Sequence, residues 1–262
     1  MHKNIDDDST IESSQVSTVH KDIPQRQAGF LWFFRSTSKR IQNKNRQQYF
    51  PSFFIPTTYN SLHLACRTGS VNEVEEQLKY EDINSNDGME NHGVTPLHVA
   101  LIHEKYDIAM LLLRKGAFVD AAANNGWTPL HIASSKGCVE VVQCLLEVYN
   151  ADLHSRDTRG WTPLFMSIFR GHIGVIQVLL NQELCIRDFR NVKDYYGQTL
   201  LMIACQGGHA DVVELLLTIG FHDIHARDHD GWTALSYAER KENSGILINM
   251  MQKYSSQVGC QY

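Results

Sequence analysis

The sequence predicts an all-α fold, a solenoid of stacked helix-turn-helix units preceded by a disordered N-terminal arm. A block that starts with threonine recurs, and its threonines, Thr95, Thr128, Thr162, Thr199 and Thr233, lie 33, 34, 37 and 34 residues apart. Apolar runs of helical length follow the blocks, for example at 108–113, 141–146 and 212–217. A period of this length indicates a repeat protein, in which each unit buries its apolar face against its neighbours.

Each unit begins with the signal for a helix start. A threonine at the N-cap accepts hydrogen bonds from free amides, and proline at the first helical position loses no bond. The block Thr-Pro-Leu-His-x-Ala is complete at 95–100 and 128–133, and a weaker first copy stands at 60–65. We expect the leucines of the blocks to point into the stack: Leu97, Leu130, Leu164, Leu201 and Leu235.

Glycine marks the end of most first helices. Only glycine adopts the left-handed backbone conformation at a helix end without a steric cost in free energy. We therefore expect that conformation at Gly69, Gly137, Gly171 and Gly208. Glu104 and Glu242 replace this glycine, and we expect the corners at these two residues to differ in shape.

The ends of the array and one long loop depart from the pattern. Repeat one has a polar second helix around 73–77, and repeat six has a charged turn at 239–243. Both features are typical of terminal repeats, which expose one face to solvent. Repeat four carries three or four extra residues within 184–196. Such an insertion either lies on the recognition edge or is neutral.

With this period and these motifs the chain resembles the ankyrin-repeat family over roughly three quarters of its length. The resemblance implies six repeats in a domain spanning 57–253, after an arm at 1–56 and before a short tail at 254–262. The expected repeats are 57–91, 92–124, 125–158, 159–195, 196–229 and 230–253.

Composition restricts the choice of partner and compartment. The arm holds eight Lys and Arg against five Asp and Glu, whereas the rest of the chain holds sixteen against twenty-four. Binding to a phosphate backbone depends on clustered cations, so we expect no nucleic-acid partner. The six cysteines include no CxxC pair, and no secretory signal opens the chain. We therefore expect a protein of the cytoplasm or nucleus.

The arm contains a run of large apolar residues beside basic ones: Phe30, Trp32, Phe33 and Phe34, then Arg35, Lys39 and Arg40. Three interpretations stay open. The run covers the exposed flank of repeat one, or it makes a weak membrane-surface contact, or the basic cluster is a nuclear-import signal.

The histidines do not predict a metal centre or an active site. His63, His98 and His131 occupy one repeat position, so stacked helices should hold them about 8–10 Å apart. A zinc ion needs its ligands at about 2 Å. In the family this histidine is structural, and no catalytic motif, cofactor motif or metal motif accompanies it. We expect neither an enzyme nor a bound cofactor.

The candidate protein-binding residues come from two repeat positions. Trp127, Trp161 and Trp232 stand between glycine and threonine, and each is either an interface anchor or a side chain packed on its own loop. By resemblance, residues before the inter-helix glycine line the concave face, where Lys136, Phe169 and Arg170 are found.

The sequence thus predicts a monomeric adaptor or scaffold that binds another protein through its concave face and inter-repeat loops. A membrane-associated scaffold anchored by the arm and an ankyrin-type inhibitor of a transcription factor are the alternatives.

Overall fold

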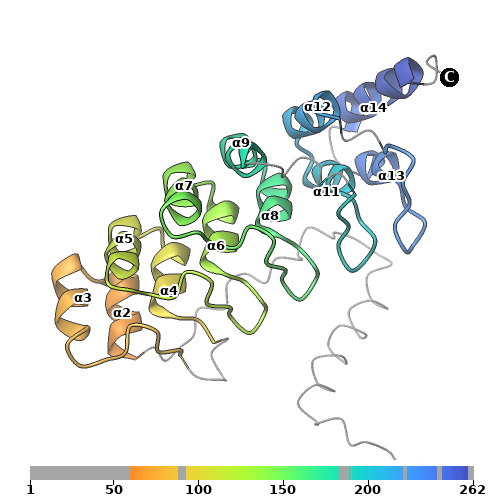
Figure 1. Ribbon diagram of the computed structural model, residues 1–262. Helices are drawn as coiled ribbons and strands as arrows, with labels where there is room; N and C mark the ends of the chain where they lie inside the picture. Colours follow the sequence, from red (N-terminus) through yellow and green to blue (C-terminus); the bar gives the residue numbers. More distant parts are fainter. Residues whose placement is uncertain are drawn as a thin grey trace, which may run out of the picture. The chain divides into compact units, whose positions relative to one another are not determined.

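The computed structural model describes residues 60–87, 93–182, 189, 191–220, 223–240 and 244–258. This part of the chain consists of paired helices that repeat along the sequence, so the predicted all-α stack is confirmed (Figure 1). The predicted arm, with its apolar and basic residues, lies outside the described residues, as do Cys185, Lys241, Glu242 and Cys260.

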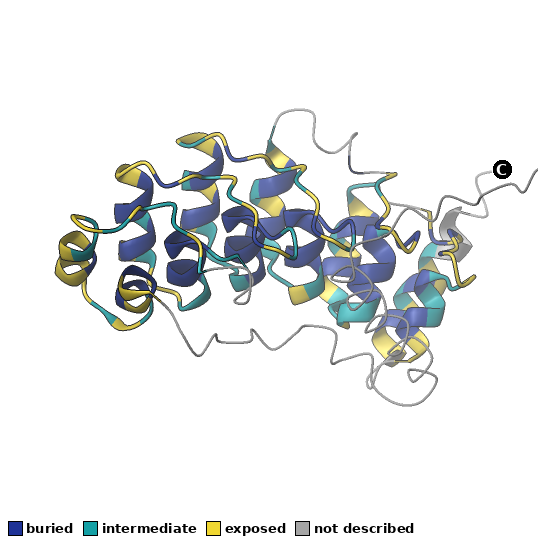
Figure 2. Ribbon diagram, turned by 90° about the horizontal axis from the view of Figure 1, so that it is seen from below, coloured by how far each residue is buried: buried dark blue, intermediate teal, exposed yellow. Residues whose placement is uncertain are grey.

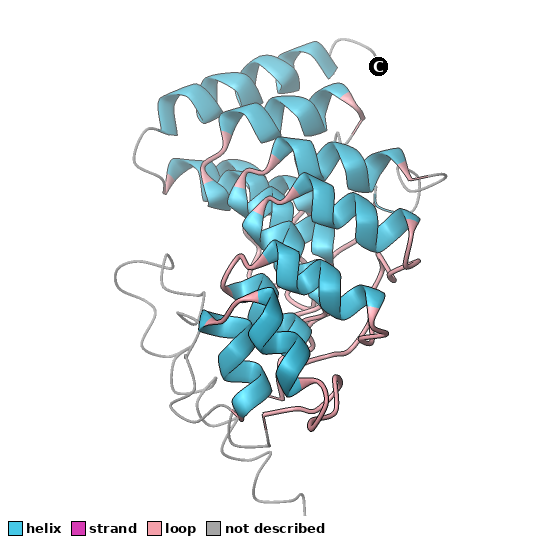
Figure 3. Cartoon of the chain, turned by 90° about the vertical axis from the view of Figure 1, so that its left-hand side faces the viewer, coloured by secondary structure: helices cyan, strands magenta, loops and turns pink. Residues whose placement is uncertain are grey.

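Two rows of helices build the stack. The inner row is α2 (Ser61–Thr68), α4 (Pro96–Ile102), α6 (Pro129–Lys136), α8 (Pro163–Arg170), α11 (Leu200–Gly207) and α13 (Ala234–Glu239). The outer row is α3 (Val71–Gln77), α5 (Tyr106–Arg114), α7 (Val139–Glu147), α9 (Ile173–Asn181), α12 (Ala210–Thr218) and α14 (Ser244–Val258). Each inner helix packs on its outer partner and on the next inner helix. Figure 3 shows the pairs stacked in succession, with the joining loops on one side.

The threonines begin the inner helices as predicted. Thr95, Thr128, Thr162, Thr199 and Thr233 all have an extended backbone at the N-cap. The Thr128 hydroxyl accepts from the His131 amide at 3.5 Å, and the Thr199 hydroxyl accepts from the Met202 amide at 3.3 Å. The hydroxyl of Thr162 has no hydrogen-bond partner among the described residues, and Phe165 stands where repeats two and three have histidine.

Two of the predicted helix ends were wrong. Gly69 has φ −81°, an extended conformation, because Ser70 directly after it caps α3. Glu104 has φ +58° and so keeps the left-handed corner that Gly137 makes with φ +76°. The glutamate corner therefore has the same backbone turn as the glycine corner, because the outer helix must fold back onto its partner in both repeats.

The core lies between the rows, and its residues follow the repeat (Figure 2). Leu97, Leu130, Leu164 and Leu201 are buried, whereas Leu235 in the last repeat is only half-buried. In the first repeat α3 leaves its glutamates exposed to solvent, as predicted for a terminal unit. Each internal repeat is thus covered on both sides by its neighbours.

The long loop after α9 contributes to the core. Residues 183–188 and 190 lie outside the described residues, but Phe189 is buried and stacks on His154 at 5.2 Å between ring centroids. Lys193 and Thr199 then form an isolated β-bridge, and no strand occurs in the described ranges. Phe189 therefore attaches the described part of the insertion to the stack, and the carbonyl of Lys193 accepts from Arg156 at 3.0 Å.

Glu104 gives a direct test of the left-handed corner. We expect Glu104→Gly to be more stable than Glu104→Ala by about 1 kcal/mol, because a left-handed residue strains alanine and not glycine. Both substitutions remove the same carboxylate, so the comparison isolates the backbone. Urea unfolding of the two variants measures the difference, and equal midpoints would show that the corner is unstrained.

Candidate functional site

Histidines of the inner helices join each repeat to the next. The Nε2 of His98 donates to the carbonyl of Trp127 at 2.9 Å, and its Nδ1 accepts from the amide of Thr95 at 3.1 Å. Two other histidines reach forward in the same way: His131 to the carbonyl of Trp161 at 3.0 Å and His63 to that of Val94 at 2.9 Å.

These rings are held neutral by their surroundings. Burial lowers the pKa of His98 to about 4, and burial also lowers the pKa of His63 and of His131. A proton on the Nδ1 of His98 would point at an amide that already donates to it. No group of three or more His, Cys, Asp or Glu within the described ranges is arranged to hold a metal ion. The histidines therefore connect repeats, which is the structural role that the resemblance implied.

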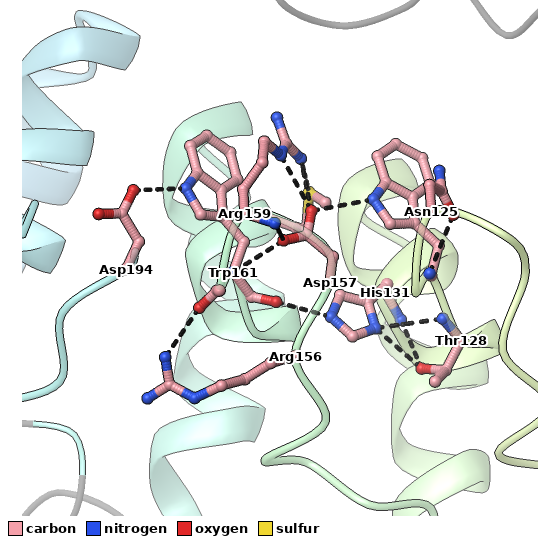
Figure 4. Close-up of polar contacts among 11 residues, drawn as sticks. Asn125, Thr128, His131, Arg156, Asp157, Arg159, Trp161 and Asp194 are labelled. Carbon is pink, nitrogen blue, oxygen red and sulfur yellow. Dashed lines mark hydrogen bonds and ion pairs between the residues drawn. The ribbon is translucent and has the colours of Figure 1, made fainter. Parts of the chain in front are cut away.

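A buried aspartate organises the loop between repeats three and four (Figure 4). Asp157 is 2% exposed, and its Oδ1 accepts from the amides of Arg159 and Trp161, both at 2.8 Å. Its Oδ2 accepts from the indole Nε1 of Trp127, one repeat earlier, at 3.1 Å. One carboxylate thus shapes its own loop and binds the preceding one.

The next loop repeats this arrangement. The Oδ1 of Asp194 accepts from the amides of Tyr196 and Gln198, at 2.9 and 2.8 Å, and its Oδ2 accepts from the indole of Trp161 at 2.9 Å. At the following junction Gln198 stands in place of tryptophan and contacts the hydroxyl of Tyr237, which donates to Asp228 at 2.6 Å.

Where the donor is missing, the acceptor is missing too. Repeat two has Val94 in the tryptophan position, and the loop that follows has Ala123 in the aspartate position. A buried carboxylate without a donor would be costly, so an apolar pair suits this junction.

The indoles of Trp127 and Trp161 therefore belong to the loops. They are 3% and 5% exposed, so neither offers much contact area to a partner. Sequence reasoning could not distinguish this role from that of an interface anchor, because the aspartate that each indole reaches lies 30 or more residues further along the chain.

Arg159 extends the Trp161 cluster toward the surface. Its guanidinium binds the Oδ2 of Asp157 through Nε at 3.0 Å and Nη2 at 2.8 Å, and lies 4.2 Å from the centroid of the Trp161 ring. Phe169, at the end of α8, is half-buried with its ring centroid 5.4 Å from that of Trp161. The predicted residues Trp161 and Phe169 are thus in one cluster.

The other predicted residues fall in two places. Lys136 and Arg170 lie at the ends of α6 and α8, which pack against each other, and Lys136 pairs with Glu104 at 2.8 Å. Trp232 lies in the last repeat, half-buried, with the guanidinium carbon of Arg240 4.7 Å from its ring centroid. The structure brings Lys136, Phe169 and Arg170 to neighbouring helix ends and leaves Trp232 two repeats away.

Sequence reasoning missed two exposed tyrosines. Tyr195 and Tyr196 form the tip of a loop and are 60% and 49% exposed. The amide of Tyr195 donates to the carbonyl of Arg159, and the carbonyl of Tyr196 accepts from the amide of His229, both at 2.9 Å. Two adjacent aromatics in a loop were visible in the sequence, but their exposure was not.

Comparison with known proteins identifies a family and a relative of this chain. A family model described as ankyrin repeats, three copies, matches residues 39–123, 118–188 and 185–258. A curated protein of Saccharomyces cerevisiae, named as the probable 26S proteasome regulatory subunit p28, is 28% identical over 202 residues, which are 75% of this chain and 86% of that protein. In addition, no helix in the described part is both long and apolar enough to cross a membrane.

The buried histidines predict a stability that depends on pH. Because the folded-state pKa of His98 is about 4 and the unfolded value is about 6.5, its contribution is complete above pH 6.5 and lost as pH falls toward 4. We expect the free energy of unfolding to lose about 2 kcal/mol more between pH 7 and 4.5 in the wild type than in His98→Gln. Urea titrations at the two pH values measure this, and parallel losses would assign the pH dependence to other groups.

The indole–aspartate bond predicts a difference between two tryptophans. Trp161→Phe should lower the free energy of unfolding by about 1–3 kcal/mol, because it leaves the buried carboxylate of Asp194 without one donor. Trp232→Phe is the matched control, since the described residues provide no hydrogen bond to its indole nitrogen. Thermal or urea unfolding of both variants tests this, and equal losses would contradict it.

Proposed function

Because the chain belongs to the ankyrin-repeat family, we propose that it is a non-catalytic adaptor or scaffold that binds another protein through its inner-helix ends and inter-repeat loops. The family model spans the stack from its first repeat to its last. The yeast relative is named as a regulatory subunit of the proteasome, which is a component of a larger protein assembly. That name supports a role in binding proteins.

The observation that carries the proposal is the hydrogen bonding between adjacent loop tips. The amide of Thr158 donates to Asn125, that of Tyr195 to Arg159 and that of His229 to Tyr196, at 2.9–3.0 Å. Buried aspartates fix the same loops from inside. A surface formed before binding avoids much of the ordering cost of association.

The side chains on this surface are of the kind that interfaces use. We assign the contact surface to Lys136, Phe169 and Arg170 together with Tyr195 and Tyr196. Tyrosine and arginine are enriched among the residues that dominate binding energy. Trp127 and Trp161 are buried and hold the loops of this surface through Asp157 and Asp194. Trp232 and Arg240 contact each other in the last repeat and are not part of this surface.

A capture experiment tests the surface. The full chain is immobilised and exposed to an extract of its native cells, in parallel with Arg170→Ala plus Tyr195→Ala. We expect the wild type to retain partner proteins that this variant loses, because both substituted side chains are exposed and neither lies in the core. Equal thermal midpoints would show that the variant is folded.

The control replaces the same residue types elsewhere. Arg114 ends the outer helix α5, Tyr80 follows the outer helix α3, and both are exposed. Arg114→Ala plus Tyr80→Ala should therefore capture the same partners as the wild type. Retention of every partner by the Arg170 and Tyr195 variant would exclude the proposed surface.

A further inference from the structure

Charge differs between the inner helices of the first four repeats and three of the outer helices. The inner helices α2, α4, α6 and α8 contain three cations, Arg67, Lys136 and Arg170, and no Asp or Glu. The outer helices α3, α7 and α12 contain seven acidic residues and no Lys or Arg. Repeats one, three and four therefore present positive charge at their inner-helix ends, and repeat two adds Lys105 just after its corner, although the repeats as a whole are acidic.

Two of these cations, together with Lys105, act on one imidazole. Burial lowers the pKa of His103 at the end of α4, and the charges of Arg67, Lys136 and Lys105 lower it further. In repeat four, Arg170 acts in the same way on His172, again after burial. We name Arg67, Lys105, Lys136 and Arg170 the basic row. It ends at repeat five, where Gln206 and Gly207 occupy the equivalent positions.

The basic row already binds one carboxylate. The Nζ of Lys136 donates to the Oε1 of Glu104 at 2.8 Å, and this pair is exposed enough for solvent to compete. An exposed pair of this kind contributes little to stability, so an incoming carboxylate can replace Glu104 at little cost.

We propose that the basic row recognises an acidic segment of the partner protein, running in extended form across the inner helices of repeats one to four. This inference rests on the proposed function and names the chemistry of its partner. Neighbouring inner helices are spaced about 8–10 Å apart, and an extended chain advances about 3.4 Å per residue. Asp or Glu at every third position of the segment would therefore match one cation per repeat.

A nucleic acid fits these observations less well. Its charge is continuous, whereas the repeats as a whole carry more Asp and Glu than Lys and Arg. Binding to phosphate strengthens with the number of cations in contact, and the row supplies only one per repeat. A short acidic peptide can follow the row without approaching the outer helices.

The test uses a fluorescent peptide of about twelve residues with Glu at every third position and Gly or Ser between, a length that spans four repeats. Fluorescence anisotropy with the full chain should show saturable binding that weakens as salt is raised, because exposed charges are screened. Lys136→Glu plus Arg170→Glu should weaken binding by about tenfold or more. Lys115→Glu plus Arg114→Glu makes the same change in charge at the end of α5 and should leave binding within about twofold of the wild type.

Three results would overturn the proposal: no binding of the peptide, equal weakening by both charge reversals, or tighter binding of polyuridine RNA or phosphatidylserine vesicles through the same two residues. The capture experiment above separates the two inferences. If capture depends on Arg170 and Tyr195 while the peptide does not bind, the protein-binding function stands and the acidic partner is excluded. If capture is independent of those residues, the function itself fails.

Discussion

Each repeat of this chain completes the hydrogen bonding of its neighbour, and the rest of the structure depends on that constraint. A carbonyl at the start of one repeat is buried only because a histidine of the previous repeat donates to it, as His98 does to Trp127. A buried carboxylate such as Asp157 is tolerated because an indole arrives from the repeat before. An isolated repeat would leave these groups unpaired, and buried unpaired groups are costly. The loops are ordered because the stack is continuous.

The sequence predicted what depends on position within one repeat, and failed where two repeats meet. The helix starts at the threonines and the buried leucines of repeats two to five follow from local chemistry and were confirmed. The partners of Trp127 and Trp161 could not be found in this way, because an indole suits an interface and a buried loop equally well. The prediction for Glu104 was also wrong. Residue preference favours glycine at that corner, but packing of the outer helix determines the backbone conformation there, and Glu104 adopts it. Exposure of Tyr195 depends on how far its loop projects, which no periodicity encodes.

The same repetition explains why a binding surface forms where it does. Inner-helix ends and loop tips occur once per repeat, so any side chain there is reproduced at regular intervals along the stack. The buried part of each loop is fixed by aspartate and tryptophan, and the exposed part is left to vary. Arg159, Phe169 and Tyr195 therefore differ between repeats without disturbing the core.

The histidine positions also divide the stack into two unequal parts. His63, His98 and His131 bridge the first three junctions, whereas Phe165, Met202 and Ser236 occupy the same position in repeats four, five and six. The last two junctions have no histidine at this position, and the longest loop enters the chain at the first of them, where His209 of repeat five instead donates to the carbonyl of Phe169 at 3.0 Å. In a linear array, opening starts at the weakest contact between units. The junction between repeats five and six, which has neither such a histidine bond nor an indole–aspartate bond among the described residues, should thus open first under thermal load.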